Sequence, residues 1–506
     1  MNLLKKHIKT LILIVIVAFL LFYFRAWFHG FVMFFYINPV IFQSIIVTAI
    51  VYYVVLKRIP ALNRKMDVQV NSGEIETINT TINTFLLPVL FVFLLIFGLV
   101  FSNWFKNVHI TENIEYSFRD NFPESTENLR LMPYSVAQRY AKDSLQLSQY
   151  KLGTENIALI EDDMSWVFPL VPDGFVIQFL NKNKGVVYVN ATKQSRNSEN
   201  VWQDMEIGEG MYITDNLFWN IYRYRYFLTL DDPYYLVDGD DILTCLGAIS
   251  YSYHMKYGIV YAVPEFEGVF VVDTDGNIDL LSPEKALEHP VLSENRIFPE
   301  RLARIYTEAY EFYLGIINKL FIHEDQIQIQ DVSDVGPRVN RQPYLMDTSE
   351  GLKWFISAEP YGQSHGIFKI FVIDAKTGKI EIFELPEDQI LTGPVKSADY
   401  VRRSNPIVDW NRFGSVEPLP FIRDQRLYWK LTVIPADSAG IAYQAFVDAH
   451  TNDVYEFVEE QDVQAFLKGE IELEEIETVA PTKEGIVDQL REKFREIEDL
   501  FEQLEL

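Results

Sequence analysis

The stretch KWFISAEPYGQSHGIFKIFVIDAKTGKIEIF, residues 353–383, decides the fold because a near copy of it follows later in the chain. YWKLTVIPADSAGIAYQAFVDAHTNDVYEF, residues 428–457, repeats its landmarks. In each copy a tryptophan stands six residues before a proline, and a glycine stands eight residues before an aspartate. Internal repetition of this kind indicates one structural unit used more than once.

The second half of each copy predicts a β-hairpin. Both are rich in β-branched and aromatic residues, with a short polar turn between two strand-like runs. Gly378 and Asn452 occupy these turns, and both residue types tolerate a positive φ. Weaker copies and short helical patterns lie elsewhere, the copies at 166–193 and 259–281 and the helices at 135–147, 299–320 and 398–403. The sequence therefore predicts tandem modules, each with one helix and an antiparallel sheet.

Residues 372–380, VIDAKTGKI, and 446–454, FVDAHTNDV, approximate the pattern VDA-x-TG-x-I in their hairpins, with Asn452 in place of the glycine in the second, and residues 271–278 match it less well. A helix followed by an antiparallel meander with this hairpin resembles the PepSY-like family of extracytoplasmic domains. The resemblance covers about half of residues 130–460. It implies modules of PepSY or cystatin type in a membrane-anchored protein, with binding, inhibitory or assembly roles in place of catalysis.

Three apolar stretches near the N-terminus, residues 11–28, 31–56 and 84–101, are long enough to cross a bilayer as helices. Lysines precede the first stretch, and Lys57, Arg58, Arg64 and Lys65 follow the second. Because cytoplasmic loops carry the excess of Lys and Arg, the N-terminus and the 57–83 loop are expected in the cytoplasm. The rest of the chain is then expected outside it.

The charge of the chain is unevenly distributed. Residues 1–109 carry a net charge of +6, whereas residues 110–506 carry −33. An acidic body of this kind argues against nucleic-acid binding, which needs a basic surface. The single cysteine, Cys245, excludes a disulfide framework and a thiolate metal cluster, and we expect it to be buried.

Few residue patterns in the sequence indicate chemistry. The stretch VVDTDGNID offers oxygen ligands for a weak Ca²⁺ site at Asp273, Asp275, Asn277 and Asp279. The alternative is a type I′ hairpin turn at Asp-Gly, because an EF-hand loop would need a glutamate where Ser282 stands. In WNIYRYRYFL, Tyr222, Tyr224 and Tyr226 alternate with arginines, which predicts a half-buried strand or a face that stacks on sugars. No HExxH, GxSxG or phosphate-binding glycine motif occurs, and no other cofactor is expected.

The C-terminus reads as an acidic linker, residues 466–483, followed by an amphipathic helix at 484–506. Apolar residues recur there at intervals of three and four, which is a heptad seam. The seam residues are Val487, Leu490, Phe494, Ile497, Phe501 and Leu504. Such a narrow seam suits self-association, and the alternative is docking of the helix on its own domain.

These observations predict an α+β protein with a membrane region at 1–105, α+β modules at 106–345 and two tandem repeat modules at 346–465. Our leading hypothesis is a non-enzymatic scaffold, anchored in the cell membrane, that self-associates into an envelope or surface assembly. The main alternative is a PepSY-like inhibitor or sensor that regulates an envelope enzyme. A third is an envelope hydrolase, which would need a cleft of converging carboxylates with shifted pKa values. The expected partners are the lipid bilayer, further copies of the chain and an envelope protein.

Overall fold

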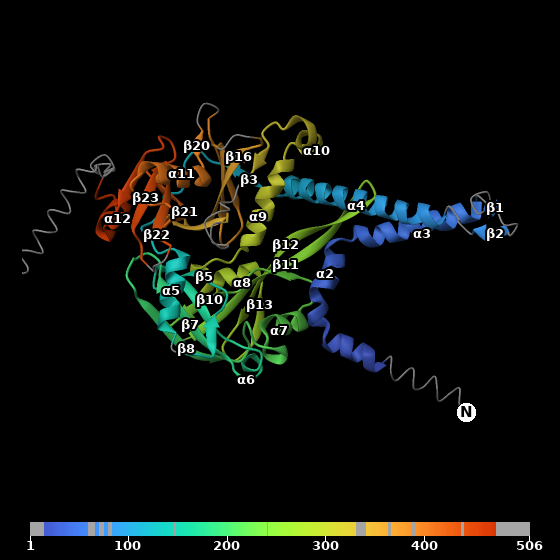
Figure 1. Cartoon of the computed structure of the whole chain (residues 1–506), viewed down its shortest axis with the longest axis horizontal. Coiled ribbons are helices and arrows are strands. Elements are labelled where there is room, and N and C mark those ends of the chain that lie inside the picture. The colour runs from blue at the N-terminus through green and yellow to red at the C-terminus, as the bar shows by residue number, and fades with distance from the viewer. Residues whose placement is uncertain are drawn as a thin grey trace, which may run out of the picture.

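The computed structural model describes residues 15–58, 66–69, 75–78, 83–145, 147–239, 241–329, 341–362, 366–386, 390–436 and 440–471. Helices from the N-terminal region extend away from a body that is built from several antiparallel sheets and their covering helices (Figure 1). The α+β class, with several antiparallel sheets, is therefore confirmed.

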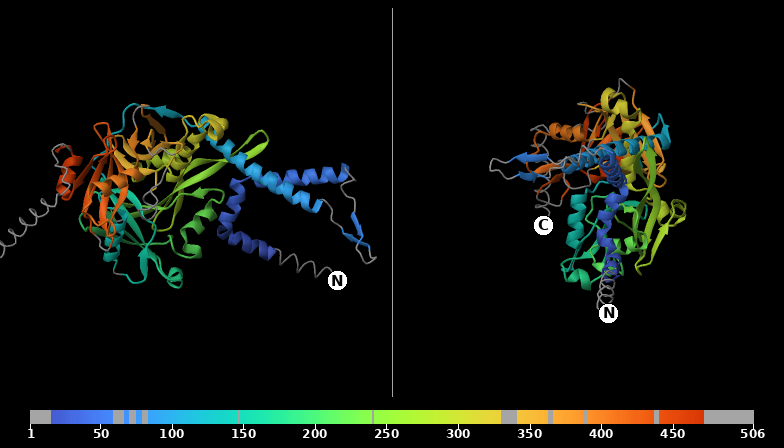
Figure 2. Two further views of the ribbon diagram at one scale, coloured as in Figure 1. Left: turned by 45° about the horizontal axis from the view of Figure 1, so that its top comes forward. Right: turned by 90° about the vertical axis from the view of Figure 1, so that its right-hand side faces the viewer.

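The N-terminal region contains a helix at Val15–Tyr23, a 3-10 turn η1 (Arg25–Phe28) and three further helices. These are α2 (His29–Ile37), α3 (Val40–Arg58) and α4 (Asn83–Asn113). Helices α3 and α4 run side by side in opposite directions and project from the body (Figures 1 and 2). At their far end β1 (Met66–Gln69) pairs antiparallel with β2 (Ile75–Ile78).

One helix in the described ranges, Pro88–Asn113, is long and apolar enough to cross a membrane. The expected single helix at 31–56 is wrong, because the structure divides it into α2 and α3 at Asn38-Pro39. Proline lacks a backbone N–H and disfavours helical geometry in the residue before it. The expected helix at 11–28 also breaks, since Val15–Tyr23 meets Arg25–Ile37 at an angle of 71°. The third expected span, 84–101, lies within the longer α4.

Helix α4 joins the projecting helices to the body. A Cβ atom on Gly98 would lie 2.5 Å from Val40 Cγ2, so the glycine permits the close contact between α4 and α3. Further along α4, Phe105 and Ile110 are buried in a cluster with Tyr261 of the body. After the helix ends, β3 (Tyr116–Phe118) pairs in parallel with a strand of the third module. The apolar helix and the body therefore share one continuous core.

The body repeats one arrangement four times, a helix followed by a four-stranded antiparallel meander. The first module has α5 (Tyr134–Ser144), β5 (Asn156–Ile160), β6 (Asp163–Pro172), β7 (Asn183–Asn190) and β8 (Ser198–Met205). The second has α7 (Leu217–Tyr224), β10 (Tyr234–Asp238), β11 (Asp241–Lys256), β12 (Ile259–Val272) and β13 (Ile278–Leu281). The third has α9 (Glu300–Ala309), β15 (Tyr344–Thr348), β16 (Gly351–Pro360), β18 (Lys369–Asp374) and β19 (Ile380–Glu384). The fourth has α11 (Pro394–Ser404), β21 (Phe413–Arg423), β22 (Arg426–Pro435), β23 (Tyr443–Asp448) and β24 (Val454–Phe457).

Short elements complete the body. The strands are β4 (Tyr150–Leu152), β9 (Thr229–Leu230), β14 (Ile327–Gln328), β17 (Gly366–Ile367) and β20 (Leu391–Thr392). The helices are α6 (Ile177–Leu180), α8 (Pro283–Glu288), α10 (Gly315–Ile317) and α12 (Glu460–Leu467). Helical turns lie at η3 (Ile213–Asp215), η4 (Leu292–Glu294), η5 (Tyr310–Phe312) and η6 (Asn318–Ile322).

Two further sequence predictions, both about elements of the body, are wrong. The long helix expected at 299–320 ends at Ala309, and Gly315, with φ +87°, interrupts the turns that follow. The strand expected through Tyr222, Tyr224 and Tyr226 is instead largely helix α7. The Asn216 side chain caps this helix by accepting a hydrogen bond from the Trp219 N–H at 2.9 Å.

The predicted hairpins are confirmed. Strand β18 pairs with β19, and β23 pairs with β24, both antiparallel. Gly378 and Asn452 have φ values of +77° and +69°. The acidic linker predicted at 466–483 begins inside α12, and its residues 472–483 lie outside the described residues, as does the helix predicted at 484–506.

Candidate ligand-binding site

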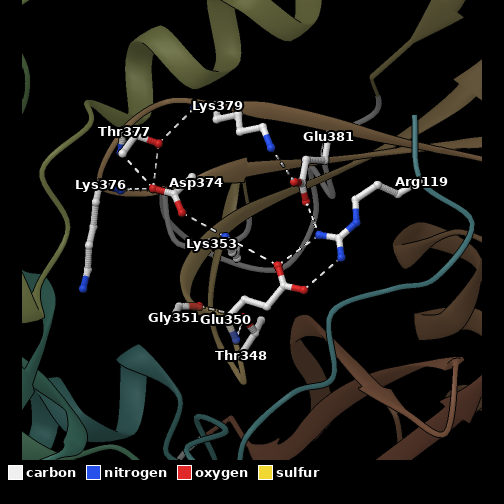
Figure 3. A network of polar contacts seen from close by, with 10 residues as sticks. All are labelled: Arg119, Thr348, Glu350, Gly351, Lys353, Asp374, Lys376, Thr377, Lys379 and Glu381. Atoms are coloured by element: carbon white, nitrogen blue, oxygen red, sulfur yellow. Dashed lines mark hydrogen bonds and ion pairs between the residues drawn. The ribbon is translucent and has the colours of Figure 1, made fainter. Parts of the chain in front are cut away.

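The repeated aspartate of the hairpins caps its own turn. Asp374 Oδ1 accepts hydrogen bonds from the N–H groups of Lys376 at 3.1 Å and Thr377 at 2.8 Å (Figure 3). In the fourth module, Asp448 Oδ1 accepts in the same way from the N–H groups of His450 and Thr451. These bonds hold the turn that sets strand register, so this part of the repeated motif is structural.

A charged network surrounds Asp374 and connects it to the segment that follows α4. Lys353 Nζ donates to Asp374 Oδ2 at 2.9 Å, and Arg119 makes a bidentate pair with Glu350, with both N–O distances 3.0 Å (Figure 3). Arg119 also donates to Glu381 Oε2 at 2.8 Å. The Arg119 guanidinium lowers the pKa of the Glu350 carboxyl below its usual value. This network ties the exit of α4 to the third module.

The repeated tryptophan has one function in three modules. The indole N–H of Trp166 donates to the Met132 carbonyl at 2.9 Å, and that of Trp354 donates to the Phe298 carbonyl at 3.2 Å. Trp429 donates to the Thr392 carbonyl at 2.7 Å. Each accepting carbonyl lies just before the helix of the same module, so the tryptophan fixes that helix against its sheet.

Two of these tryptophans each lie beside an arginine in an equivalent position. Arg130 stands two residues before Met132 in the sequence RLMP, and Arg296 stands two residues before Phe298 in RIFP. The Arg130 Cζ atom lies 5.3 Å from the Trp166 ring centroid, and the Arg296 Cζ atom lies 5.6 Å from that of Trp354. The first and third modules therefore present the same arginine and tryptophan pair.

The two pairs line a single cavity of about 150 Å³. Glu300 of α9 and Asp232, just before β10, also line it, so three modules contribute. The cavity is smaller than pockets for drug-sized ligands, which measure roughly 300–1,000 Å³. The full set of lining residues is Arg130, Thr154, Glu155, Asn156, Ile157, Trp166, Asp232, Arg296, Glu300, Arg341, Pro343, Tyr344, Leu345 and Trp354.

Arg130 is a buried charged residue of this cavity with one unpartnered polar atom. Its exposed fraction is 6%, and its Nε atom has no hydrogen-bond partner within the described residues. Burial lowers the pKa of its guanidinium, and the charge of Glu417 opposes that shift. Leaving one buried donor of a guanidinium without a hydrogen-bond partner costs about 1–3 kcal/mol. A carboxylate or phosphate oxygen in the cavity would offset that cost.

Glu417 is placed near Arg130 by an irregular strand. Its φ is +52°, at a bulge between Val416 and Leu419 where the pairing of β21 with β22 shifts register. The bulge directs Glu417 Oε1 to the Tyr134 N–H, 2.5 Å away, at the start of α5. Non-glycine residues in this backbone region carry strain that the surrounding fold must hold in place.

Glu300 adds a carboxyl group to the cavity beside Arg296. Burial, together with the neighbouring Asp231, raises the pKa of the Glu300 carboxyl to about 7. The Glu300 side chain keeps 45% of its surface accessible, and Arg296 Nη1 lies 3.6 Å from Glu300 Oε2. Burial also raises the pKa of Asp231. The cavity thus combines Arg130 and Arg296 with the Glu300 carboxyl group, whose ionisation is disfavoured.

The calcium residues predicted from the sequence lie away from this cavity. Both oxygens of Asp273 accept hydrogen bonds from Asn277, at 2.8 and 2.7 Å, and hold the turn between β12 and β13. A type I′ turn needs a positive φ at both central residues. Gly276 has φ +84°, but Asp275 does not have a positive φ, so the turn is not of type I′. Across the described part of the chain, no group of three or more His, Cys, Asp or Glu side chains is arranged to hold a metal ion. The site at Asp273, Asp275, Asn277 and Asp279 stays a prediction.

The other candidate site, the seam from Val487 to Leu504, lies outside the described residues. Sequence reasoning did not single out Arg130 or Arg296. The signal for them was present, because RLMP and RIFP share one pattern, and each directly precedes a predicted helix. Comparing the segments before the helices, as well as the hairpins, would have found both.

Comparisons with known proteins add little. No protein-family model matches the chain, and no curated protein matches it. A crystal structure of alpha-L-arabinofuranosidase from Lactobacillus brevis aligns with a TM-score of 0.16 and 8% sequence identity, covering 63% of this chain and 76% of that one. A TM-score this low carries no information about fold or reaction. The PepSY-like resemblance stays a prediction.

Proposed function

We propose that this chain is a membrane-anchored, extracytoplasmic regulator, without catalytic activity, that binds a small carboxylate-bearing molecule between its modules. The observation that supports it is Arg130, which is buried at a cavity and whose Nε atom has no hydrogen-bond partner within the described residues. Arg130 would hold the carboxylate, and the Glu300 carboxyl group would accept a hydrogen bond from an ammonium or hydroxyl group of the same ligand.

The position of the cavity favours regulation. Its lining comes from three modules, and the third module is joined to α4 through β3 and Arg119. A ligand that bridges the modules would stabilise one relative arrangement of them, and α4 would connect that arrangement to the membrane. Orientation of the body outside the cytoplasm is part of the proposal and rests on the distribution of Lys and Arg around the apolar stretches.

The test begins with native mass spectrometry of the detergent-solubilised protein, to find small molecules that co-purify. Thermal shifts are then measured with that molecule and with acetate, succinate, glycine and inorganic phosphate. We expect stabilisation by at least one carboxylate, lost in Arg130→Gln and in Arg296→Gln. Arg402→Gln, on the exposed side of α11, is the matched control and should keep the shift.

The outcomes separate three functions. If neither a co-purified molecule nor any carboxylate stabilises the protein through Arg130, the regulator proposal is wrong. Turnover of the bound molecule, abolished in Glu300→Gln, would favour the hydrolase because Glu300 could act as a general acid near neutral pH. Large homo-oligomers whose unfolding midpoint does not change with any of these ligands would favour the scaffold.

A further inference from the structure

Helix α2 has two unlike faces. His29 and Met33, one turn apart, are buried, with exposed fractions of 6% and 2%. On the other side Phe31 is 68% exposed and Phe34 is 55% exposed, and Trp27 in the preceding turn is 63% exposed. An apolar face of this size is rarely left in water.

The body side of α2 is firmly attached. The Nε2 atom of His29 lies 3.1 Å from the Tyr226 carbonyl oxygen and 3.0 Å from that of Leu228. Its ring also stacks on Tyr222, with centroids 3.5 Å apart. These contacts fix the orientation of α2 on the body, so its exposed aromatic side points away from the body.

A second exposed apolar feature lies at the same level, at the tip of the β11–β12 hairpin. These two strands extend far beyond their neighbours in the sheet, and their tip lies beside α3 and α4 (Figure 1). Met255 and Tyr257 at the tip are 70% and 87% exposed. The Gln43 side chain on α3 accepts from the Val260 N–H at 3.0 Å and also donates to the Gly258 carbonyl.

The chain itself indicates what covers these two features. Only Asn38 and Pro39 separate α2 from α3, which packs along α4, the helix long enough to cross a membrane. The hairpin tip contacts α4 directly, where Tyr257 and Phe105 have ring centroids 5.8 Å apart. Lys256 beside the tip pairs with Glu112 of α4 at 3.1 Å. Helix α4 has no charged residue before Lys106, which directly follows Phe105, so charged groups begin at this level. Aromatic residues at that boundary are characteristic of a membrane interface.

We infer that α2 lies flat in the headgroup layer of the bilayer, and that the β11–β12 tip inserts beside it, so that the body docks on the membrane surface. The inference rests on the proposed membrane anchoring and adds a second contact between body and lipid. Helix α2 is then an interfacial helix, with its apolar side toward the acyl chains and its other side against protein.

The test is quenching of tryptophan fluorescence in vesicles of phosphatidylcholine brominated either near the headgroup or near the bilayer centre. We expect bromine near the headgroup to quench more of the tryptophan emission than bromine near the bilayer centre. Trp27→Phe should remove much of the difference between the two lipids. Trp202→Phe is the matched control, because Trp202 is 53% exposed on β8, far from the projecting helices (Figure 1). Tyr257→Trp, made in the Trp27→Phe protein, should restore headgroup-proximal quenching from the hairpin tip.

Trp104 on α4 separates failure of this inference from failure of the anchoring itself. If Trp104→Phe shows that Trp104 is quenched while Trp27 is not, α4 meets lipid and the docking inference is wrong. If bromine at the bilayer centre quenches Trp27 most strongly, this segment is buried as a span and the inference is again wrong. If neither tryptophan is quenched, membrane anchoring fails as well.

Discussion

Trp429 shows what the repeated motif contributes at the level of one side chain. Its exposed fraction is 0%, and its indole N–H donates to the Thr392 carbonyl at 2.7 Å. Trp429→Phe removes the hydrogen bond to the Thr392 carbonyl. The smaller phenyl ring also leaves part of the space that the indole filled empty. We expect the free energy of unfolding to fall by about 2–4 kcal/mol, since lost hydrogen bonding and lost packing add.

Denaturant titration of the detergent-solubilised protein measures this loss. Trp202→Phe, at an exposed position on β8, should change the free energy of unfolding by no more than about 0.5 kcal/mol. Equal effects of the two substitutions would contradict the view that the repeated tryptophan fixes each helix to its sheet.

Glu300 makes stability depend on pH with a definite sign. Its pKa rises from 4.5 to about 7 in the folded protein. Between these values the folded state binds more protons than the unfolded state, so the free energy of unfolding falls as pH rises. The stabilisation is complete below pH 4.5 and is gone above about pH 7.

The glutamine in Glu300→Gln cannot titrate. The thermal unfolding midpoint of this variant should therefore fall less than that of the unsubstituted protein as the pH rises from 5 to about 7.5. The measurement is the midpoint of thermal unfolding across that range. Glu288→Gln, at an exposed position of α8, should leave the slope unchanged. A slope that is the same in all three proteins would show that Glu300 ionises normally.

At the scale of elements, the contact between α3 and α4 depends on Gly98. A side chain there would meet Val40 Cγ2, with even the Cβ atom only 2.5 Å away. We expect Gly98→Leu to push the helices apart and to lower the thermal unfolding midpoint in detergent, by an amount corresponding to about 1–3 kcal/mol. Gly30→Ala in α2 is the control, because nothing lies within 4 Å of a Cβ atom at Gly30. Equal midpoints for the two variants would refute close helix packing at Gly98.

Local pattern predicted some elements well and failed on others for identifiable reasons. The hairpins were predictable, because strand composition and turn residues agree at Gly378 and Asn452. The strand predicted through Tyr222 was wrong, because alternation of Tyr and Arg suggested period two while Asn216 caps a helix. The single helix predicted at 31–56 was wrong because Pro39 ends it, although hydropathy alone continues across the break.

For the whole molecule, the predicted C-terminal seam concerns assembly. We expect deletion of residues 472–506 to convert a homo-oligomer into a monomer in mild detergent, because the seam residues lie in that segment. Light scattering coupled to size-exclusion chromatography gives the mass. The unfolding midpoint of the body should not change, since α12 closes the fourth module before the deletion begins. A monomeric intact protein would remove the scaffold hypothesis.

The sequence by itself determined the local features of this protein: the apolar N-terminal stretches, the acidic remainder, the hairpins and the repetition of a helix with an antiparallel sheet. Each depends on composition and spacing within a few tens of residues. The tertiary structure alone decided that Arg130 and Arg296, 166 residues apart, line one cavity, and that Glu417 approaches the start of α5 through a bulge. Contacts between modules depend on how whole sheets pack. A local pattern in one chain carries no information about that packing.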